Sequence, residues 1–202
     1  MVNGDWLTEL LRQCAHPGGA AICGAMLWYP DETIQHAGIV TGLGGYAGHS
    51  HKYKKKGGSG YLFRTSTVQD FSGVTGACLL VKTAVYDEMH GLDEQFAVAF
   101  NDVDFCLRVR DAGYRIAWTP YAELIHYESK SRGGDEKDPV KAARFAAEQQ
   151  RLYTIHGKEN ILDDPYYNPN LTRDREDFSE SDDLRRLKEG RVTVRFRGGT
   201  LQ

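Results

Sequence analysis

The sequence has few cysteines and no long apolar run. Its four cysteines, Cys14, Cys23, Cys78 and Cys106, lie far apart and form no C-x-x-C pair, which excludes a zinc knuckle and a disulfide framework. We interpret them as reduced packing residues. No window approaches the roughly 18 consecutive apolar residues of a membrane span, and the first residues carry charges where a signal peptide needs an apolar stretch. We therefore expect a cytoplasmic protein.

The chain also lacks an excess of positive charge. It has 25 Lys and Arg against 28 Asp and Glu, a net charge of −3, whereas a nucleic-acid binder normally has a strongly basic face. A nucleic-acid partner is therefore not expected. The 202 residues are 41% hydrophobic and 26% charged, which fits one soluble globular domain, or part of one, with a real core.

The first half alternates between helix and strand patterns. Apolar residues recur at helical spacing over residues 5–15, with Asp5 as a candidate cap. Residues 20–30 and 33–45 are extended, largely apolar runs that end in proline or glycine, so both are predicted strands. Residues 42–66 are rich in Gly, Lys, Tyr and His without a period, which indicates a long loop.

The second half continues the alternation. Residues 74–81, "VTGACLLV", form the strongest predicted core strand, and a short helix follows that ends before Gly91. Asn101 or Asp102 is expected to cap the next helix, which Gly113 ends. Strand-like segments at 114–120 and 122–129 and a helix at 139–156 complete the pattern, and the residues after it read as a polar tail that packs little. The fold class is therefore α/β, with functional groups expected at the carboxyl ends of strands.

Asp102 is the main candidate for chemistry. A carboxylate in the first turn of a helix is stabilised in its charged form, so it could accept a proton from a substrate, but Asp is also a preferred cap, and both interpretations stay open. Asp104 lies two residues on and faces another side of the helix. The two form a D-x-D pattern, which we do not assign to a metal because such a pair is better placed on a loop after a strand.

His126 is the second candidate. It ends an apolar run and precedes a loop whose hydroxyls and cation, at Ser129, Ser131 and Arg132, could hold phosphate oxygens beside a metal-bound imidazole. A structural histidine is the alternative. His49 and His51 lack a third ligand nearby, and the adjacent "HKYKKKGG" is either a solvated loop or a contact for an anionic lipid or a diphosphate-linked acceptor.

A resemblance is visible across most of the chain. The segments "DWLTELL", "GAMLWYPDETIQHAG", "VTGACLLVK", "GLDEQFAVAFNDVDFCLRVRDAGYRIAWTP", "AELIHYESKSRG" and "DPYYNPNL" with "EDFS" occur in an order that resembles the C-terminal part of bacterial family 2 glycosyltransferases of the GT-A fold, of the kind named for O-antigen or rhamnan synthesis. The block at 91–133 is far more specific than any short motif.

The resemblance implies roles for particular residues. Asp102 corresponds to the catalytic base that deprotonates an acceptor hydroxyl, and Asn101 stands where the family commonly has Glu, which removes a neighbouring charge. Gly76 and Ala77 correspond to a small-residue segment that lines the sugar pocket, and we expect Asn101 and Asp104 to line the same pocket. His126 corresponds to a histidine near the metal or the donor diphosphate.

The resemblance also implies what this chain does not contain. Family members have an N-terminal, nucleotide-binding Rossmann-like half, ending in a metal-binding D-x-D, before a segment like "DWLTELL". The expected fold is thus an incomplete GT-A-like mixed sheet with flanking helices. It would comprise an acceptor-side part at 1–135, a helical extension at 136–160 and a polar tail at 161–202.

The expected function follows from that comparison. It is part of an inverting glycosyltransferase that moves a sugar from a nucleotide-sugar donor to a glycan or lipid-linked acceptor in cell-surface polysaccharide synthesis, inactive as this chain alone. Mg²⁺ or Mn²⁺, held mostly outside this chain, is the expected cofactor. Association with the inner membrane surface and self-association through an exposed sheet edge are further expectations. The alternative is a non-catalytic module that binds glycans or self-associates.

Overall fold

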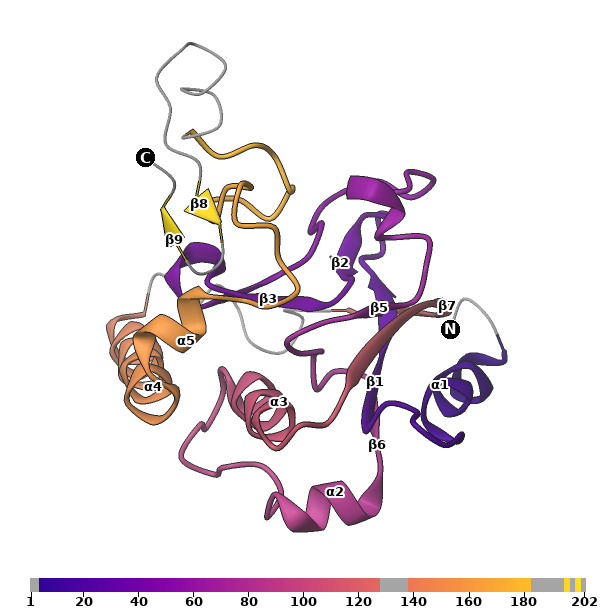
Figure 1. Cartoon of the computed structure of the whole chain (residues 1–202), viewed down its shortest axis with the longest axis horizontal. Helices are drawn as coiled ribbons and strands as arrows, with labels where there is room; N and C mark the ends of the chain where they lie inside the picture. Colours follow the sequence, from indigo (N-terminus) through magenta and orange to yellow (C-terminus); the bar gives the residue numbers. More distant parts are fainter. Residues whose placement is uncertain (1–3, 128–137, 183–194, 197–198, 201–202) are drawn as a thin grey trace.

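The computed structural model describes residues 4–127, 138–182, 195–196 and 199–200, and it is of the mixed α/β class (Figure 1). A five-stranded sheet has the order β2-β1-β7-β5, with β6 also paired to β1. Its strands are β1 (Ile22–Trp28), β2 (Ile34–His36), β5 (Gln69–Asp70), β6 (Leu79–Val81) and β7 (Ile116–Ile125). The central pair β1 and β7 is parallel, and the other pairs are antiparallel.

Alternating side chains of β1 fill two core layers, as expected for a strand buried on both faces. Cys23, Ala25 and Leu27 pack toward α1 (Trp6–Cys14), whose Leu10 and Cys14 are buried against them. Ile22 and Met26 point to the opposite side, where α3 (Asn101–Asp111) contributes Phe105, Cys106 and Val109. In Figure 1, α1 and α3 lie on the two sides of the sheet. The expected α/β class is confirmed.

The remaining elements surround this centre. They are β3 (Ile39–Thr41) and β4 (Ala47–His49), which pair in a separate two-stranded sheet, the short 3₁₀ turns Leu43–Gly45 and Tyr61–Phe63, α2 (Thr83–Glu88), α4 (Pro139–His156) and α5 (Lys158–Leu162), and the hairpin β8 (Arg195–Phe196) with β9 (Gly199–Thr200). None of the helices within the described ranges is long and apolar enough to cross a membrane.

The predicted strand at 74–81 is wrong over its first part. Only Leu79–Val81 is a strand. Val74 instead exchanges backbone contacts with the Cys106 thiol, its N–H 3.5 Å from Sγ, and Thr75 donates its N–H to the ring of His36. Side chains from other elements thus take the place of a neighbouring strand.

β7 is one strand where the sequence suggested two. Its pairing with β1 shifts register between Ala25 and Met26, because Thr119 pairs with Ala25 and Glu123 pairs with Met26. The extra residues, which include Pro120, form the irregularity, as expected for a proline within a sheet. This shift carries the end of β7, and His126 after it, to the edge of the sheet.

Residues 161–182 do not behave as the expected tail. Ile161, Tyr167, Leu171 and Phe178 are buried in the main cores. The buried carboxylate of Asp164 accepts hydrogen bonds from the N–H of Thr41 at 2.7 Å and from its hydroxyl at 3.2 Å. This segment is therefore part of the globular body, whereas residues 191–194 of the strand-like "RVTVRF" lie outside the described residues. The division into three parts stays a prediction.

Candidate functional site

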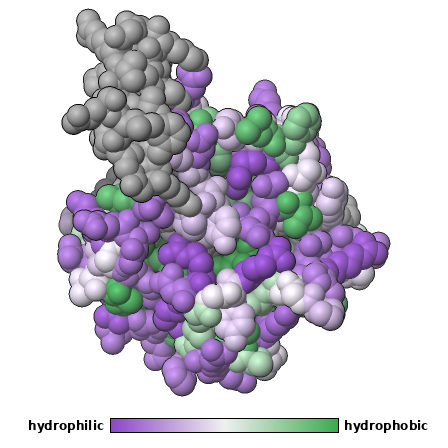
Figure 2. Space-filling model, viewed as in Figure 1, coloured by the Kyte–Doolittle hydropathy of each residue, from purple (hydrophilic) through white to green (hydrophobic). Residues whose placement is uncertain are grey.

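A cleft of about 870 Å³ opens between the start of α3, the segment 75–77, β4 and α4. Figure 2 shows that hydrophilic residues cover most of this face, with hydrophobic residues in small separate groups. The polar residues that line the cleft are Gln35, His49, Lys52, Thr75, Asn101, Asp102, His126, Tyr127, Arg144, Glu148 and Glu176. The cleft therefore brings together side chains from segments far apart in the sequence.

Asp102 is held at the edge of this cleft by two backbone hydrogen bonds. Its Oδ2 accepts from the N–H of Gly76 at 2.8 Å, and its Oδ1 accepts from the N–H of Val103 at 2.9 Å. The predicted capping role is wrong for both candidates, because the residue before the helix is Phe100, in a left-handed conformation, and Asn101 and Asp102 already lie in the first turn. A fixed carboxylate at a helix N-terminus can accept a proton from a group in the cleft.

Asn101, Gly76 and Ala77 line the same cleft as Asp102. The Asn101 side-chain oxygen accepts the N–H of Asp102 at 2.8 Å, which orients the start of the helix. A methyl group at Gly76 would lie 3.5 Å from the Asp102 Cβ, an ordinary contact. Steric exclusion by Asp102 therefore does not explain a glycine at 76, and the role of small residues beside a sugar stays a prediction.

Asp104 does not line the cleft, contrary to the expected pocket role. It is 1% exposed and lies against Arg108 and His156, with Oδ2 2.9 Å from Arg108 Nε and Oδ1 2.8 Å from His156 Nε2. Arg108 also donates to the carbonyl of Gly91 at 2.9 Å. Asp104 thus joins α3, α4 and the segment after α2, and the two carboxylates of "DVD" point to different environments.

His126 lies in the cleft just after β7. Its N–H donates to the Trp28 carbonyl at 2.9 Å, and its Nδ1 is buried without a hydrogen-bond partner among the described residues. This nitrogen could serve as one ligand of a metal, but the described part of the chain has no group of three His, Cys, Asp or Glu that could hold an ion. Ser129, Ser131 and Arg132 lie outside the described residues. The diphosphate and metal roles stay predictions.

The two histidines of "HSH" point to different environments. His49 lines the cleft, and its Nδ1 lies 2.9 Å from Nδ1 of His36. His51 is buried against the Phe178 ring, with centroids 4.1 Å apart, and burial lowers its pKa to about 4, with Lys54 and Arg64 adding to the effect. A shared metal site is therefore not formed by this pair.

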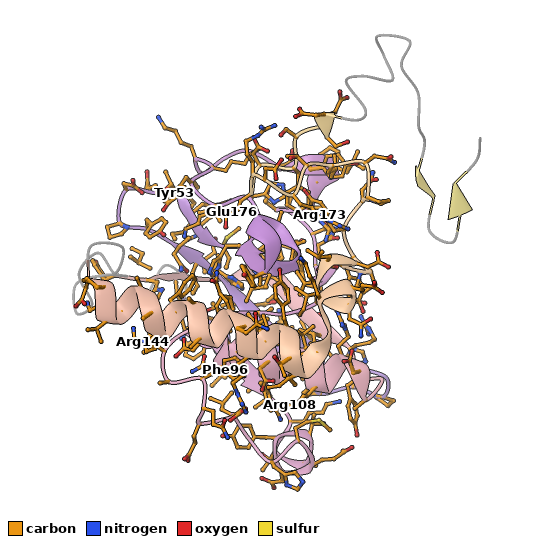
Figure 3. The ribbon with its side chains drawn as sticks, turned by 90° about the vertical axis from the view of Figure 1, so that its left-hand side faces the viewer. Tyr53, Phe96, Arg108, Arg144, Arg173 and Glu176 are labelled. Atoms are coloured by element: carbon orange, nitrogen blue, oxygen red, sulfur yellow. The ribbon has the colours of Figure 1, made fainter. Side chains whose placement is uncertain are left out.

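Three cleft residues were not predicted. Arg144 and Glu148 come from α4, and Glu176 comes from the segment expected to be a tail; Figure 3 labels Arg144 on α4, which crosses the front, and Glu176 above it. Glu148 is buried and accepts the N–H groups of Val98 and Ala99 at 3.2 and 2.8 Å. Their helical spacing of four could have marked the α4 pair as one face, but no sequence pattern marks Glu176.

Comparisons with known proteins extend this description. The chain is 47% identical over 179 residues to the uncharacterized protein y4gI of Sinorhizobium fredii, covering 88% of this chain and 19% of that protein. It is 35% identical over 173 residues to the O-antigen biosynthesis protein RfbC of Myxococcus xanthus, covering 85% of this chain and 13% of that protein.

A shorter match is to the N-acetylglucosaminyl-diphospho-decaprenol L-rhamnosyltransferase of Mycobacterium tuberculosis, 32% identical over 80 residues, 40% of this chain and 24% of that protein. The chain thus spans less than a quarter of each of these three relatives. No family model and no solved structure matches it. Together, the similarities support a glycosyltransferase-like family for this chain.

Proposed function

We propose that the described residues form the acceptor side of an inverting glycosyltransferase in cell-surface polysaccharide synthesis. The observation that supports this most directly is the position of Asp102, whose carboxylate is oriented by two backbone N–H groups at the edge of a large polar cleft. The names of two similar proteins, which refer to O-antigen synthesis and rhamnosyl transfer, support the same reaction class. A GT-A-like arrangement of the whole enzyme is part of this proposal.

In this reaction Asp102 acts as the general base. An acceptor hydroxyl donates a hydrogen bond to the carboxylate, and its oxygen attacks the anomeric carbon of a nucleotide-activated sugar. The new glycosidic C–O bond forms as the bond to the nucleoside diphosphate breaks on the opposite face, so the configuration inverts. The hydroxyl proton ends on Asp102, and the diphosphate leaves with the electron pair of the broken bond.

The donor diphosphate is proposed to lie toward His126 and the loop that contains Ser129, Ser131 and Arg132. A divalent cation such as Mg²⁺ or Mn²⁺ would neutralise the charge of the leaving diphosphate, and the buried, unpartnered Nδ1 of His126 is the described atom that suits such a role. Calorimetric titration with uridine or thymidine diphosphate plus Mn²⁺ measures this part of the proposal. A His126→Ala variant should bind the nucleotide more weakly.

Two further proposals concern partners. The segment 52–56 combines lysines with Tyr53, which is 65% exposed, and would contact an anionic lipid or lipid-linked acceptor at the inner face of the membrane. Self-association would use a sheet edge, because β5 and β6 each pair on one side only within the described strands. Sedimentation with anionic vesicles and light scattering test these proposals separately.

The central test uses the gene in its own host. Asp102→Asn should abolish the surface polysaccharide made by this system, visible as a lost ladder on a stained gel, while protein abundance stays unchanged. Asp111→Asn is the matched control, because Asp111 lies at the exposed end of the same helix. A complete polysaccharide ladder in Asp102→Asn would refute the catalytic role and favour a non-catalytic glycan-binding module.

A further inference from the structure

The cleft contains a second carboxylate that the proposed reaction does not use. Glu176 comes from the segment after α5, and its Oε1 accepts the N–H of His49 at 3.0 Å. Its own carbonyl accepts the N–H of His51 at 2.8 Å. Two contacts, one through the side chain and one through the backbone, therefore fix Glu176 against β4.

The strand that holds Glu176 is itself held by a pair of histidine rings. Nε2 of the buried His36 accepts N–H groups from Gly38 and Thr75, both at 3.3 Å, so the ring proton of His36 must be on Nδ1. This Nδ1–H then donates to Nδ1 of His49, 2.9 Å away. The pair links β2 to β4, and Thr75 links it to the segment that contacts Asp102. The two carboxylates of the cleft are thus positioned by one connected set of hydrogen bonds.

Packing alone gives no reason for a carboxylate at position 176. Burial raises the pKa of Glu176, so the charged form is disfavoured at this place, and the positive charge of Lys52 offsets the effect only in part. Oε1 is used by the fold, whereas Oε2 has no hydrogen bond within the described part of the chain. A charge kept at a cost inside a cleft is characteristic of a binding group.

We propose that Glu176 binds a hydroxyl group of a sugar ring through Oε2, and that the His36 and His49 rings position it. The ligand class is a neutral pyranose, because an ionised carboxylate accepts hydrogen bonds from hydroxyl groups but repels phosphate. This inference rests on the proposed function, since it assigns the sugar-binding wall of the same cleft. Glu176 then determines which sugar binds, and Asp102 performs the proton transfer.

The test is saturation-transfer NMR of the full chain with two probes, N-acetylglucosamine and methyl α-L-rhamnoside, each titrated to obtain a dissociation constant. Glu176→Gln keeps the shape and the bond to His49 but removes the charge, and it should weaken binding of the better probe at least about tenfold, the loss expected for a charge-assisted hydrogen bond. Glu176→Ala should weaken it at least as much. Glu94→Gln, an exposed residue outside the cleft, is the control and should bind like the wild type.

Two results would overturn the assignment: unchanged binding in Glu176→Gln, or no binding of either probe by the wild type. Circular dichroism of each variant verifies that it is folded, and the glutamine variant serves if the alanine variant unfolds. The result is separable from that for Asp102. Asp102→Asn should still bind the probe, so a glycan-binding chain without transfer would leave Glu176 assigned while refuting the catalytic proposal.

Discussion

Asp102 and Asp104 are two residues apart, yet replacing them should have opposite consequences. Asp104 is 1% exposed and accepts hydrogen bonds from Arg108 and from His156, whose side chain is 5% exposed. Asp104→Ala would leave both donors without their acceptor in a buried environment. Asp102→Ala removes an acceptor at the open edge of the cleft, where water can replace it.

The magnitudes separate the two cases clearly. Removing one partner of a buried ion pair costs about 3–5 kcal/mol, so Asp104→Ala should lose a large share of the roughly 5–15 kcal/mol that stabilises a typical domain. Arg108 keeps its carbonyl partners at Met89 and Gly91, which places the loss nearer the lower figure. Asp102→Ala should lose about 1 kcal/mol, the net worth of ordinary hydrogen bonds.

Urea unfolding at neutral pH, followed by circular dichroism, measures both free energies of unfolding. The wild type and the two alanine variants are compared under the same conditions, with the slope of free energy against urea examined for a change in unfolding behaviour. If Asp104→Ala unfolds within about 1 kcal/mol of Asp102→Ala, the structural role of Asp104 is refuted.

Three further outcomes follow from perturbed ionisable groups. His51 has its pKa lowered to about 4 by burial first and by nearby cations second, so stability should fall by up to about 3 kcal/mol as pH drops from 6.5 toward 4, because the unfolded chain takes up the proton first. His51→Gln should flatten that part of the stability curve, and an unchanged curve would contradict the assignment. Glu176 has a raised pKa, so its ionisation costs stability at neutral pH; Glu176→Gln should be more stable than the wild type there, with the difference shrinking on acidification, and thermal melts at several pH values measure it. Burial raises the pKa of the Cys106 thiol to about 12, so a thiol reagent should modify it only after unfolding in urea; fast labelling of Cys106 in the native protein would show that the site opens.

The sequence patterns predicted those elements whose determinants are local. The helices at 6–14 and 139–156 have apolar residues at helical spacing, and Asp138 caps the second by accepting the N–H of Val140 at 2.9 Å. The strand at 22–28 is apolar throughout because both of its faces are buried. In each case the residues that determine the element lie inside it or next to it.

Predictions failed where distant side chains determine the backbone. Residues 74–78 are apolar enough for a strand, but the ring of His36, the thiol of Cys106 and the carboxylate of Asp102 take their hydrogen bonds. Asp104 had one local signal, Arg108 four residues later, while its other partner lies 52 positions away.

The site was predicted on one side only. Asp102, Asn101, Gly76, Ala77 and His126 do line one cleft. The opposite wall comes from residues whose sequence context is a run of charges or a regular helix, and no period in the sequence shows that such residues return to the cleft.

The contacts that close the cleft have a consequence for the order in which the protein is made. Asp164 bonds to Thr41 across 123 positions, and Glu176 bonds to His49 across 127. Contacts so distant along the chain form slowly, because a long loop must be closed first. On the ribosome, β4 and its neighbours are synthesised long before residue 176 emerges. The nascent chain would therefore present its unfilled apolar surface to chaperones until the last of these segments arrives.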